Sequence, residues 1–426
     1  MVSRRLIMGV AVSAAMLAAC GGGGSDDDSG SAQIRLVNAS SAYSTLDLTV
    51  SDSNVATGVA YGGASSYASA KAGESVTALV KSAGSTLSSL YPTLTKGSHY
   101  SLIAYGWSGN MKSTILQEEE VAPAENYSKL LVLNLAADAG TLDVYLTQNT
   151  DSLDNASPTI SAITGGGSSG YTSISSGTYR VRVTGAGKKS DLRLDIPSIT
   201  LSSKQVGSLV ITPTPGGVLV NSILMTQQGS VAAHGATNAR ARVVAAVADG
   251  AQVNASLAGT ALMPTSTAPS IGEYQIVAAG SPSLLVHVNG QAVPVPAPAL
   301  TAGNDYTVLV WGEPGAPQVS VIGDDNRLPA TTGTAKFRVI NGVARLNAGL
   351  TMTLDYSAIA SNVTPGTASA VATVNSSSSS LLNITAPTSA TPVYSVSSLP
   401  VLSGGIYTVF MMGGANNIQG TLRRER

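Results

Sequence analysis

Residues 94–105 read LTKGSHYSLIAY, and this stretch decides the fold because it recurs along the chain. Its mark is a Gly three residues before Tyr100, the residue that opens a short apolar strand. The pattern returns at residues 300–311 and 401–412, and residues 201–212 carry a degenerate copy without the Gly and the Tyr in their usual places. Four copies, about a hundred residues apart, indicate tandem repeats of one structural unit.

Each repeat also opens on a similar apolar stretch, and three repeats continue into a second one. Their alternation of apolar and polar residues predicts half-buried strands. Several short antiparallel strands separated by Gly-rich turns are typical of an all-β sandwich, immunoglobulin-like or prealbumin-like. The opening stretches are Ile34–Asn38, Leu130–Asn134, Ala241–Ala245 and Phe337–Asn341, and the second stretches are Leu46–Val50, Leu142–Leu146 and Leu350–Asp355.

We therefore predict a row of four tandem antiparallel sandwich domains after an export signal. Polar stretches rich in Gly, Ala and Thr at 118–126, 227–238 and 324–334 are expected to be linkers. The predicted segments are a signal peptide at 1–19, a flexible tether at 20–31, and repeats at 32–122, 127–228, 239–325 and 334–426.

The composition supports folded β domains and argues against some partners. The 45 Gly and 19 Pro fit strands joined by turns, and 43% hydrophobic residues provide enough apolar surface to favour packed domains over disorder. The net charge is -1 and only 11% of residues are charged, so the chain has no basic field for binding nucleic acid.

The amino terminus has the layout of a signal peptide. Arg4 and Arg5 precede an apolar run, Leu6–Leu17, that is too short to span a membrane as a retained helix. Cys20 follows two alanines and is the one cysteine of the chain, so a disulfide within the chain is excluded and a free thiol or an intermolecular bridge are the plain alternatives. The paired arginines also weakly resemble a twin-arginine signal, although we favour the general secretory route.

Leu17-Ala18-Ala19-Cys20 resembles the lipobox of bacterial lipoproteins. This resemblance implies that the Cys20 thiol carries lipid and that the membrane is a partner. Because Gly21, and not Asp, follows the cysteine, it also implies sorting to the outer membrane, facing the periplasm or the cell surface.

The repeats themselves resemble a bacterial family, the domain of unknown function numbered 4397. The resemblance rests on the Val-Asn-Ala opening, the Leu-Asp-Leu second strand, the Tyr-Gly step and the Gly-x-x-Tyr closing strand, and it is strongest in the first two repeats. It implies extracytoplasmic β domains, often in tandem and often on lipoproteins. It supplies no catalytic residues.

The chain carries little catalytic or metal-binding chemistry, and we predict no catalytic residues, no metal and no cofactor. His99, His234 and His287 fall in different repeats without ligand spacing, and no Ser stands in the Gly-x-Ser-x-Gly setting of a nucleophile. Asp324 and Asp325, with the adjacent Asn, are the remaining candidates for a calcium site, and a solvated linker is the alternative.

Two tryptophans near the ends of closing strands are candidates for recognition. A flat ring beside a loop can stack on a sugar or a partner surface, whereas the plain alternative is that it covers the end of a sandwich core. Trp311 occupies a register that is apolar in most repeats, so we expect core packing there. Trp107 lies two residues further along and is the better candidate for a ligand contact.

The function that follows is a non-enzymatic protein of the cell envelope, held by lipid at Cys20, that binds or spaces other components. Loops on the rigid sandwiches would carry recognition of an envelope glycan or of a protein. The alternative is an enzyme, or an enzyme accessory, acting on envelope polysaccharide, since the fold alone does not decide activity.

Overall fold

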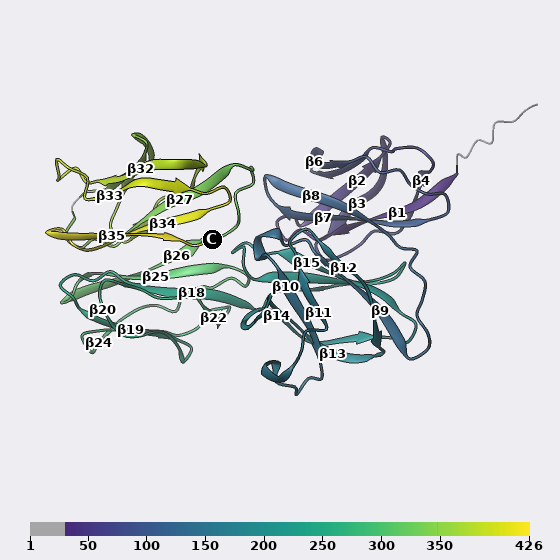
Figure 1. The fold of residues 1–426 in the computed structure, drawn as a ribbon, viewed down its shortest axis with the longest axis horizontal. Helices are drawn as coiled ribbons and strands as arrows, with labels where there is room; N and C mark the ends of the chain where they lie inside the picture. The colour runs from purple at the N-terminus through teal and green to yellow at the C-terminus, as the bar shows by residue number, and fades with distance from the viewer. Residues whose placement is uncertain (1–29, 347) are drawn as a thin grey trace, which may run out of the picture.

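The computed structural model describes residues 30–346 and 348–426. Cys20, the predicted signal peptide and most of the predicted tether lie outside the described residues. The regular elements of the described part are strands, apart from two short 3-10 turns, η1 (Ala137–Ala139) and η2 (Leu153–Asn155), which confirms the all-β fold class (Figure 1). It contains no helix of the length and apolarity that crossing a membrane requires.

The strands form eight sheets, two in each of four sandwiches. In every sandwich one sheet, here called the central sheet, contains the predicted opening and closing strands, and the other is called the outer sheet. In repeat 1 the central sheet runs β4 (Ala68–Lys71), β1 (Ser31–Asn38), β7 (His99–Trp107), β8 (Asn110–Gln117), and the outer sheet runs β3 (Ser53–Ala60), β2 (Thr45–Val50), β5 (Ala78–Ser82), β6 (Ser85–Leu90). In repeat 2 the central sheet runs β12 (Ser168–Ser175), β9 (Tyr127–Asn134), β15 (Val206–Pro213), β16 (Val220–Thr226), β17 (Val231–His234), and the outer sheet runs β11 (Ile160–Ile163), β10 (Leu142–Thr147), β13 (Gly177–Gly185), β14 (Lys188–Leu201).

Repeats 3 and 4 share this plan, with the first edge of the central sheet split into two short strands. In repeat 3 the central sheet runs β21 (Ser270–Ile271) and β22 (Gln275–Ala278), β18 (Asn238–Ala245), β25 (Asp305–Glu313), β26 (Ala316–Asp324), and the outer sheet runs β20 (Thr260–Thr267), β19 (Gln252–Leu257), β23 (Leu284–Val288), β24 (Gln291–Val293). In repeat 4 the central sheet runs β30 (Thr367–Ala368) and β31 (Ala372–Asn375), β27 (Thr334–Asn341), β34 (Ile406–Gly414), β35 (Asn417–Arg424), and the outer sheet runs β29 (Ser357–Val363), β28 (Leu350–Leu354), β32 (Ser377–Thr385), β33 (Tyr394–Val401).

The recurring Gly-x-x-Tyr stretch forms a tight corner before each closing strand. In repeat 1 the Tyr100 hydroxyl accepts a hydrogen bond from the backbone N–H of Thr95 at 2.9 Å, and the tyrosines of repeats 3 and 4 make the same contact. Gly97 holds a left-handed φ of 78°, which explains the glycine. Lys204 adopts a φ of 64° at this place in repeat 2, so the degenerate copy keeps the backbone shape without the glycine.

The opening and closing strands lie side by side and parallel at the middle of each central sheet. β1 pairs with β7, β9 with β15, β18 with β25, and β27 with β34. The sequence predicted antiparallel, half-buried strands, but these strands are buried on both faces: all eight residues of β15 are buried. Burial on both faces is typical of parallel pairing, and it requires a second layer over the central sheet.

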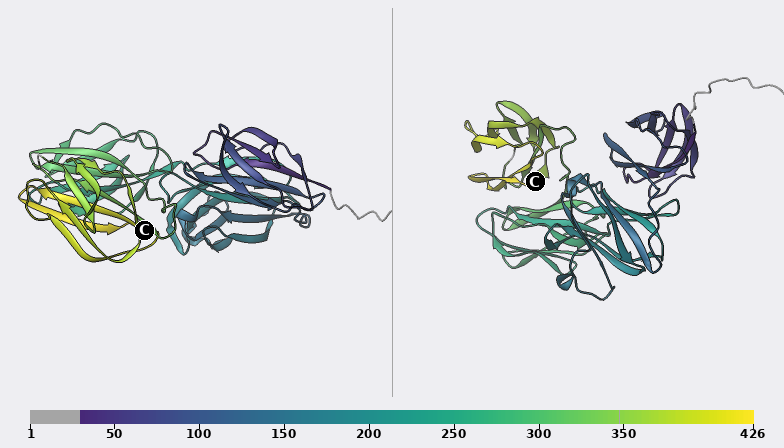
Figure 2. Two further views of the ribbon diagram at one scale, coloured as in Figure 1. Left: turned by 90° about the horizontal axis from the view of Figure 1, so that it is seen from above. Right: turned by 45° about the vertical axis from the view of Figure 1, so that its right-hand side comes forward.

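That second layer is the central sheet of the neighbouring repeat. Repeats 1 and 2 pack face to face through Val37, Ile103, Val210 and Ile223, among others. Repeats 3 and 4 pack in the same way, through the cluster Val244, Ala246, Leu309, Ile340, Phe410 and Met412. The repeats therefore form two side-by-side pairs, and not a single row of four (Figures 1 and 2).

Buried ion pairs cross the interface between repeats 3 and 4 in both directions. Arg242 of repeat 3 makes a bidentate contact with Glu425 of repeat 4, at 2.7 and 2.9 Å, and Arg338 of repeat 4 contacts Asp324 of repeat 3 at 2.7 Å. The two arginines hold the same place in their opening strands, so this interface has approximate two-fold symmetry.

The pair of repeats 1 and 2 keeps only one half of this arrangement. Arg35 holds the equivalent place in repeat 1, bonds Glu118 at 3.0 Å and donates to the carbonyl of Gly229 in repeat 2 at 2.6 Å. Leu131 stands at this place in repeat 2. Glu118 is 1% exposed, so the first residue of the predicted linker at 118–126 is a buried partner of the fold.

Another predicted linker also differs from the structure. Residues 227–238 contain β17, which adds a fifth strand to the central sheet of repeat 2 by pairing with β16. The polar, Ala-rich composition of this segment suits an edge strand, whose outer side faces solvent.

Removing one partner of the buried pair is expected to destabilise repeats 3 and 4. The substitution Arg242→Leu leaves Glu425 buried without its cation, at a cost of about 3–5 kcal/mol in the free energy of unfolding. The measurement is urea unfolding followed by tryptophan fluorescence in a Trp107→Phe background. Trp311, which packs at this interface, is then the one remaining tryptophan and reports on repeats 3 and 4.

The control is Arg345→Leu, which removes a contact to Glu313 between the same repeats. Arg345 has a 72% exposed side chain, so we expect a loss below about 1 kcal/mol. The double variant Arg242→Leu/Glu425→Leu should recover most of the lost stability. Equal losses for the Arg242 and Arg345 variants would contradict the assigned role of the buried pair.

Candidate functional site

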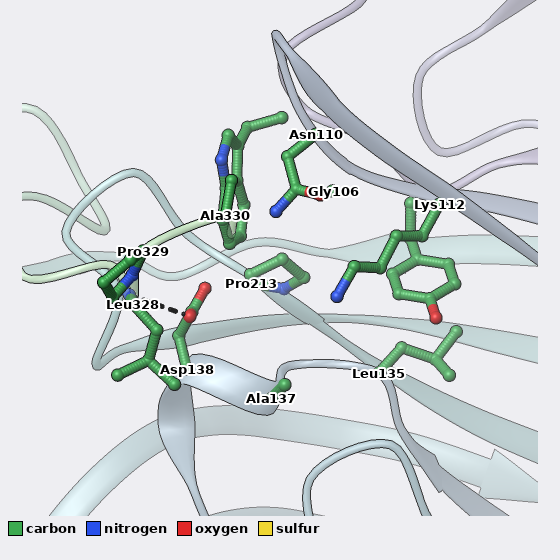
Figure 3. A pocket seen from close by; sticks show the side chains of 12 residues that line it. Gly106, Asn110, Lys112, Leu135, Ala137, Asp138, Pro213, Leu328, Pro329 and Ala330 are labelled. Carbon is green, nitrogen blue, oxygen red and sulfur yellow. Dashed lines mark hydrogen bonds between the residues drawn. The ribbon is translucent and has the colours of Figure 1, made fainter. Parts of the chain in front are cut away.

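A pocket lies where the two pairs of repeats meet, and we call it the junction pocket. Its volume is about 110 Å³. Three segments that are far apart in the sequence form it: the β7–β8 hairpin of repeat 1, the η1 turn with the end of β15 in repeat 2, and the segment between repeats 3 and 4 (Figure 3). The lining residues are Tyr105, Gly106, Trp107, Asn110, Lys112, Leu135, Ala137, Asp138, Pro213, Leu328, Pro329 and Ala330.

The β7–β8 hairpin places Trp107 on the wall of this pocket. Trp107 is the last residue of β7 and pairs with Asn110, the first residue of β8. Gly106 just before it has a φ of 108°, and a side chain there would start 2.4 Å from the carbonyl oxygen of Asn110. The strand continues through this glycine for one residue, which is Trp107.

An asparagine at the end of β9 fixes the loop that carries the other side of the pocket. The Asn134 side chain donates to the carbonyls of Gly140 and Ile163, at 2.9 and 3.0 Å, and accepts from the backbone N–H of Ala136 at 3.2 Å. Asn38 makes the same three kinds of contact at the end of β1. These contacts explain the asparagine of the Val-Asn-Ala opening, and in repeat 2 they hold the η1 turn in place.

Asp138 of the η1 turn is a buried carboxylate with a free oxygen. It is 3% exposed, and its Oδ1 accepts a hydrogen bond from the backbone N–H of Leu328 at 3.0 Å. Its Oδ2 is buried and has no hydrogen-bond partner among the described residues. Burial raises the pKa of Asp138, and the positive charges of Arg426, Lys336 and Lys112 oppose that rise.

Figure 3 shows the side chains of Asp138, Lys112 and Asn110 pointing toward a common space from opposite sides of the pocket. They offer a carboxylate acceptor, an ammonium donor and an amide that does both. Arg327 lies over the Trp107 ring, with its Cζ 5.3 Å from the ring centroid. Asp325 holds that guanidinium at 2.8 and 3.1 Å.

This arrangement suits a small ligand rich in hydroxyl groups. The free oxygen of Asp138 needs an O–H or N–H donor, because an unpaired buried acceptor costs free energy. Lys112 and Asn110 supply donors to the oxygens of the same ligand, and the indole of Trp107 supplies a flat apolar wall. A few converging polar groups beside an aromatic ring are typical of a site that orients a ligand.

The other residues predicted from the sequence lie away from this pocket. Trp311 is inside β25, where its Nε1 donates to Ser320 Oγ at 3.1 Å, and it packs against the interface of repeats 3 and 4 and not against a sandwich core. His99, His234 and His287 lie in β7, β17 and β23.

The predicted calcium candidates are committed to ion pairs. Asp324 contacts Arg338, and Asp325 contacts Arg327 and, at 2.9 Å, Lys336. Asp324 is 6% exposed, so neither a calcium site nor a solvated linker describes it. The described residues hold no group of three or more His, Cys, Asp or Glu side chains suited to a metal ion.

Sequence reasoning missed Asp138, Lys112 and Asn110. Asp138 follows the Val-Asn-Ala type of opening by a few residues, and Lys112 lies in an ordinary strand, so neither stands in a motif. Lys112 and Asp138 are 26 residues apart, and this spacing does not show that they face each other. The packing of repeat 1 against repeat 2 brings them together.

The raised pKa of Asp138 makes a pH-dependent prediction. A carboxyl group whose pKa is higher in the folded state binds its proton more tightly in that state. The free energy of unfolding therefore falls as the pH rises from the unfolded pKa to the folded pKa, and the loss is complete above the folded pKa. Asp138→Asn keeps an acceptor for Leu328 and removes the charge. We expect it to raise the urea midpoint at neutral pH and to have little effect below pH 3.8, the ordinary value at which the unfolded carboxyl is also protonated. A lower midpoint for the variant at neutral pH would contradict the unpartnered state of Asp138.

Comparisons with known proteins address the family and leave the activity open. The chain is similar to a solved structure, the Bacillus anthracis TIE protein, at 12% identity over 72% of this chain and 55% of that chain, with a TM-score of 0.13. The match thus spans about half of that protein, and at this TM-score it says nothing about fold or function. No curated protein matches the chain.

The family model described as Domain of unknown function (DUF4397) matches residues 32–145 and 239–349. The first match covers repeat 1 and reaches into β10 of repeat 2, and the second covers repeat 3 and reaches the start of repeat 4. We expected the strongest match in the first two repeats, whereas repeat 3 is matched along its length. Together the two segments make up more than half of the chain, which therefore belongs to the DUF4397 family of domains of unknown function.

Proposed function

We propose that the protein is a non-enzymatic glycan-binding protein of the cell envelope, held to the membrane by lipid at Cys20. The observation that carries the binding role is the buried Oδ2 of Asp138, which has no hydrogen-bond partner in the described part of the chain and faces Lys112 and Asn110 beside Trp107. A sugar ring offers hydroxyl groups to all three polar side chains and a C–H face to the indole.

The energetics of Asp138 support a binding role over a structural one. A buried carboxylate oxygen without a donor costs the folded protein stability, and such costs concentrate at functional sites. The other buried carboxylates at the repeat interfaces, Glu118, Asp324 and Glu425, each have an arginine partner. Within residues 30–346 and 348–426, Asp138 has the Leu328 N–H as its one hydrogen-bond donor, so a ligand hydroxyl would complete its hydrogen bonding.

The pocket accommodates one sugar unit of a longer chain better than a whole oligosaccharide. Its volume of about 110 Å³ is below the usual range for drug-sized ligands, about 300–1,000 Å³. One wall is the segment Leu328–Ala330, which joins repeats 3 and 4. Binding there would hold the two pairs of repeats in their observed arrangement.

Replacing the aromatic wall is expected to weaken glycan binding. For the soluble form, residues 21–426, we expect Trp107→Ala to lower affinity about tenfold or more in a panel of bacterial envelope polysaccharides, measured by titration calorimetry. Asp138→Asn should also weaken binding, because an N–H group replaces an acceptor. The control is Tyr356→Ala, which removes an aromatic ring that is 84% exposed in repeat 4.

Three outcomes decide the binding proposal. Weaker binding by the Trp107 and Asp138 variants, with the Tyr356 variant unchanged, supports it. Equal binding by all variants, or no binding to any polysaccharide, would overturn it. Release of shorter products by the unmodified protein, with loss in Asp138→Asn, would replace it with a hydrolase that acts on the same polymer.

The anchor is tested separately from the pocket. Cys20→Ser in the full chain removes the thiol that accepts the lipid, so we expect loss of fatty-acid labelling and release from the membrane fraction. A variant that changes Ser25 to Ala in the same segment should label normally. Continued membrane association of Cys20→Ser would show that the lipid proposal is wrong.

A further inference from the structure

A second cavity, which we call the arginine pocket, lies where repeats 2, 3 and 4 meet. Its volume is about 280 Å³, and it shares no lining residue with the junction pocket. Five arginines from three repeats line it, together with Glu273 and Glu425. These arginines are Arg193 of β14, Arg240 of β18, and Arg423, Arg424 and Arg426 at or just after β35.

Three of the arginines already have carboxylate partners. Arg193 forms a bidentate contact with Asp191 at 2.6 Å for both bonds, and Arg240 does so with Asp305 at 2.8 and 2.5 Å. Arg423 contacts Glu273 at 2.6 Å. These pairs fix the guanidinium groups in place, so the wall of the cavity is preorganised.

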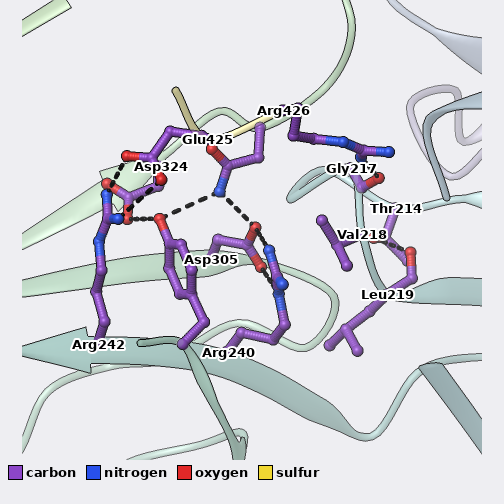
Figure 4. Close-up of polar contacts among 12 residues, drawn as sticks. Thr214, Gly217, Val218, Leu219, Arg240, Arg242, Asp305, Asp324, Glu425 and Arg426 are labelled. Atoms are coloured by element: carbon purple, nitrogen blue, oxygen red, sulfur yellow. Dashed lines mark hydrogen bonds and ion pairs between the residues drawn. The ribbon is translucent and has the colours of Figure 1, made fainter. Parts of the chain in front are cut away.

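Arg426 lines the same cavity, and its guanidinium has no carboxylate partner in the described part of the chain. Its Nη1 donates to the carbonyl of Gly217 in repeat 2, at 2.9 Å, and Figure 4 shows the side chain extending toward that loop. Burial and the nearby charges of Arg193 and Arg240 lower the pKa of Arg426, while Asp138 and Asp305 act in the opposite sense. The neighbouring arginines therefore disfavour the charged form of Arg426, and an anion bound beside it would offset that repulsion.

The carboxylates around the cavity are held by donors of the described residues. Asn326 donates to Asp305 and to Tyr274, at 2.7 and 3.1 Å. The Asp305 carboxylate therefore accepts hydrogen bonds from both Asn326 and Arg240. Glu425 is held by Arg242. Arg193 is fully engaged, because its Nη1 also donates to the carbonyls of Ala139 and Val218. Arg424 and Arg426 donate to backbone carbonyls and have no carboxylate partner among the described residues, and their remaining guanidinium N–H groups are the preferred partners of phosphate oxygens.

We propose that the arginine pocket binds a phosphate group, with Arg426 as the principal donor and Arg424 as the supporting donor. The phosphate comes either from a soluble phosphorylated compound or from the headgroup of an anionic lipid. A bound phosphate would connect repeats 2, 3 and 4, because its donors come from repeat 4 and the wall behind them is built by repeats 2 and 3. The site does not depend on glycan binding in the junction pocket.

The test is titration calorimetry of the soluble form with inorganic phosphate, at constant ionic strength set by chloride. We expect saturable binding that Arg426→Gln weakens about tenfold or more, the value of one charged hydrogen bond. Arg345→Gln, which removes an exposed arginine elsewhere, should bind as the unmodified protein does. Arg424→Gln, at an exposed position, is a second variant that tests the site if Arg426→Gln does not fold.

Vesicles of phosphatidylcholine, with and without phosphatidylglycerol, separate the two sources of phosphate. Sedimentation with the anionic vesicles alone, lost in the variants of the arginine pocket and kept in Arg345→Gln, supports a lipid headgroup. Binding of inorganic phosphate without sedimentation supports a soluble compound. The absence of both, or binding that Arg426→Gln and Arg424→Gln leave unchanged, would overturn the proposal.

Discussion

The structure depends on one constraint: the parallel opening and closing strands must be covered on both faces. The outer sheet of the same repeat covers one face, and only a second central sheet has a matching apolar surface for the other. A repeat alone would expose residues such as Val244 and Leu309, or Ile340 and Phe410, to water. The hydrophobic effect therefore joins the repeats in pairs.

Buried arginines give this pairing its register. An arginine placed among apolar residues must meet a carboxylate, because an unpaired buried charge costs several kcal/mol. Arg242 meets Glu425 and Arg338 meets Asp324, and these reciprocal contacts allow a single alignment of repeats 3 and 4. In repeat 2 the same place holds Leu131, so the pair of repeats 1 and 2 relies on Arg35 and Glu118 with backbone groups of the partner.

Both proposed sites arise where the pairs of repeats meet each other. The β7–β8 hairpin and the η1 turn are connecting segments of rigid sandwiches, which is where proteins of this type carry recognition. Asp138 is held within that junction by the N–H of Leu328, and Arg426 by the carbonyl of Gly217. The divergence of the repeats is thus useful, because each pocket takes a different side chain from a different copy of the same unit.

The sequence by itself determined the repeated unit and most of its strands. The Gly-x-x-Tyr corner and the asparagine that ends the opening strand make their contacts within one repeat. Such contacts recur with each copy of the unit, so a repeated sequence pattern can reveal them. The same holds for the place of Trp107 at the end of its strand. Composition and alternation do not reveal that the opening and closing strands are parallel and buried on both faces. A buried face is apolar whether a sheet of the same repeat or of another repeat covers it. Only the tertiary structure decided the pairing of repeats, the burial of Glu118 and Asp324, and the meeting of Trp107 with Asp138, since these follow from packing between units whose positions no local pattern records.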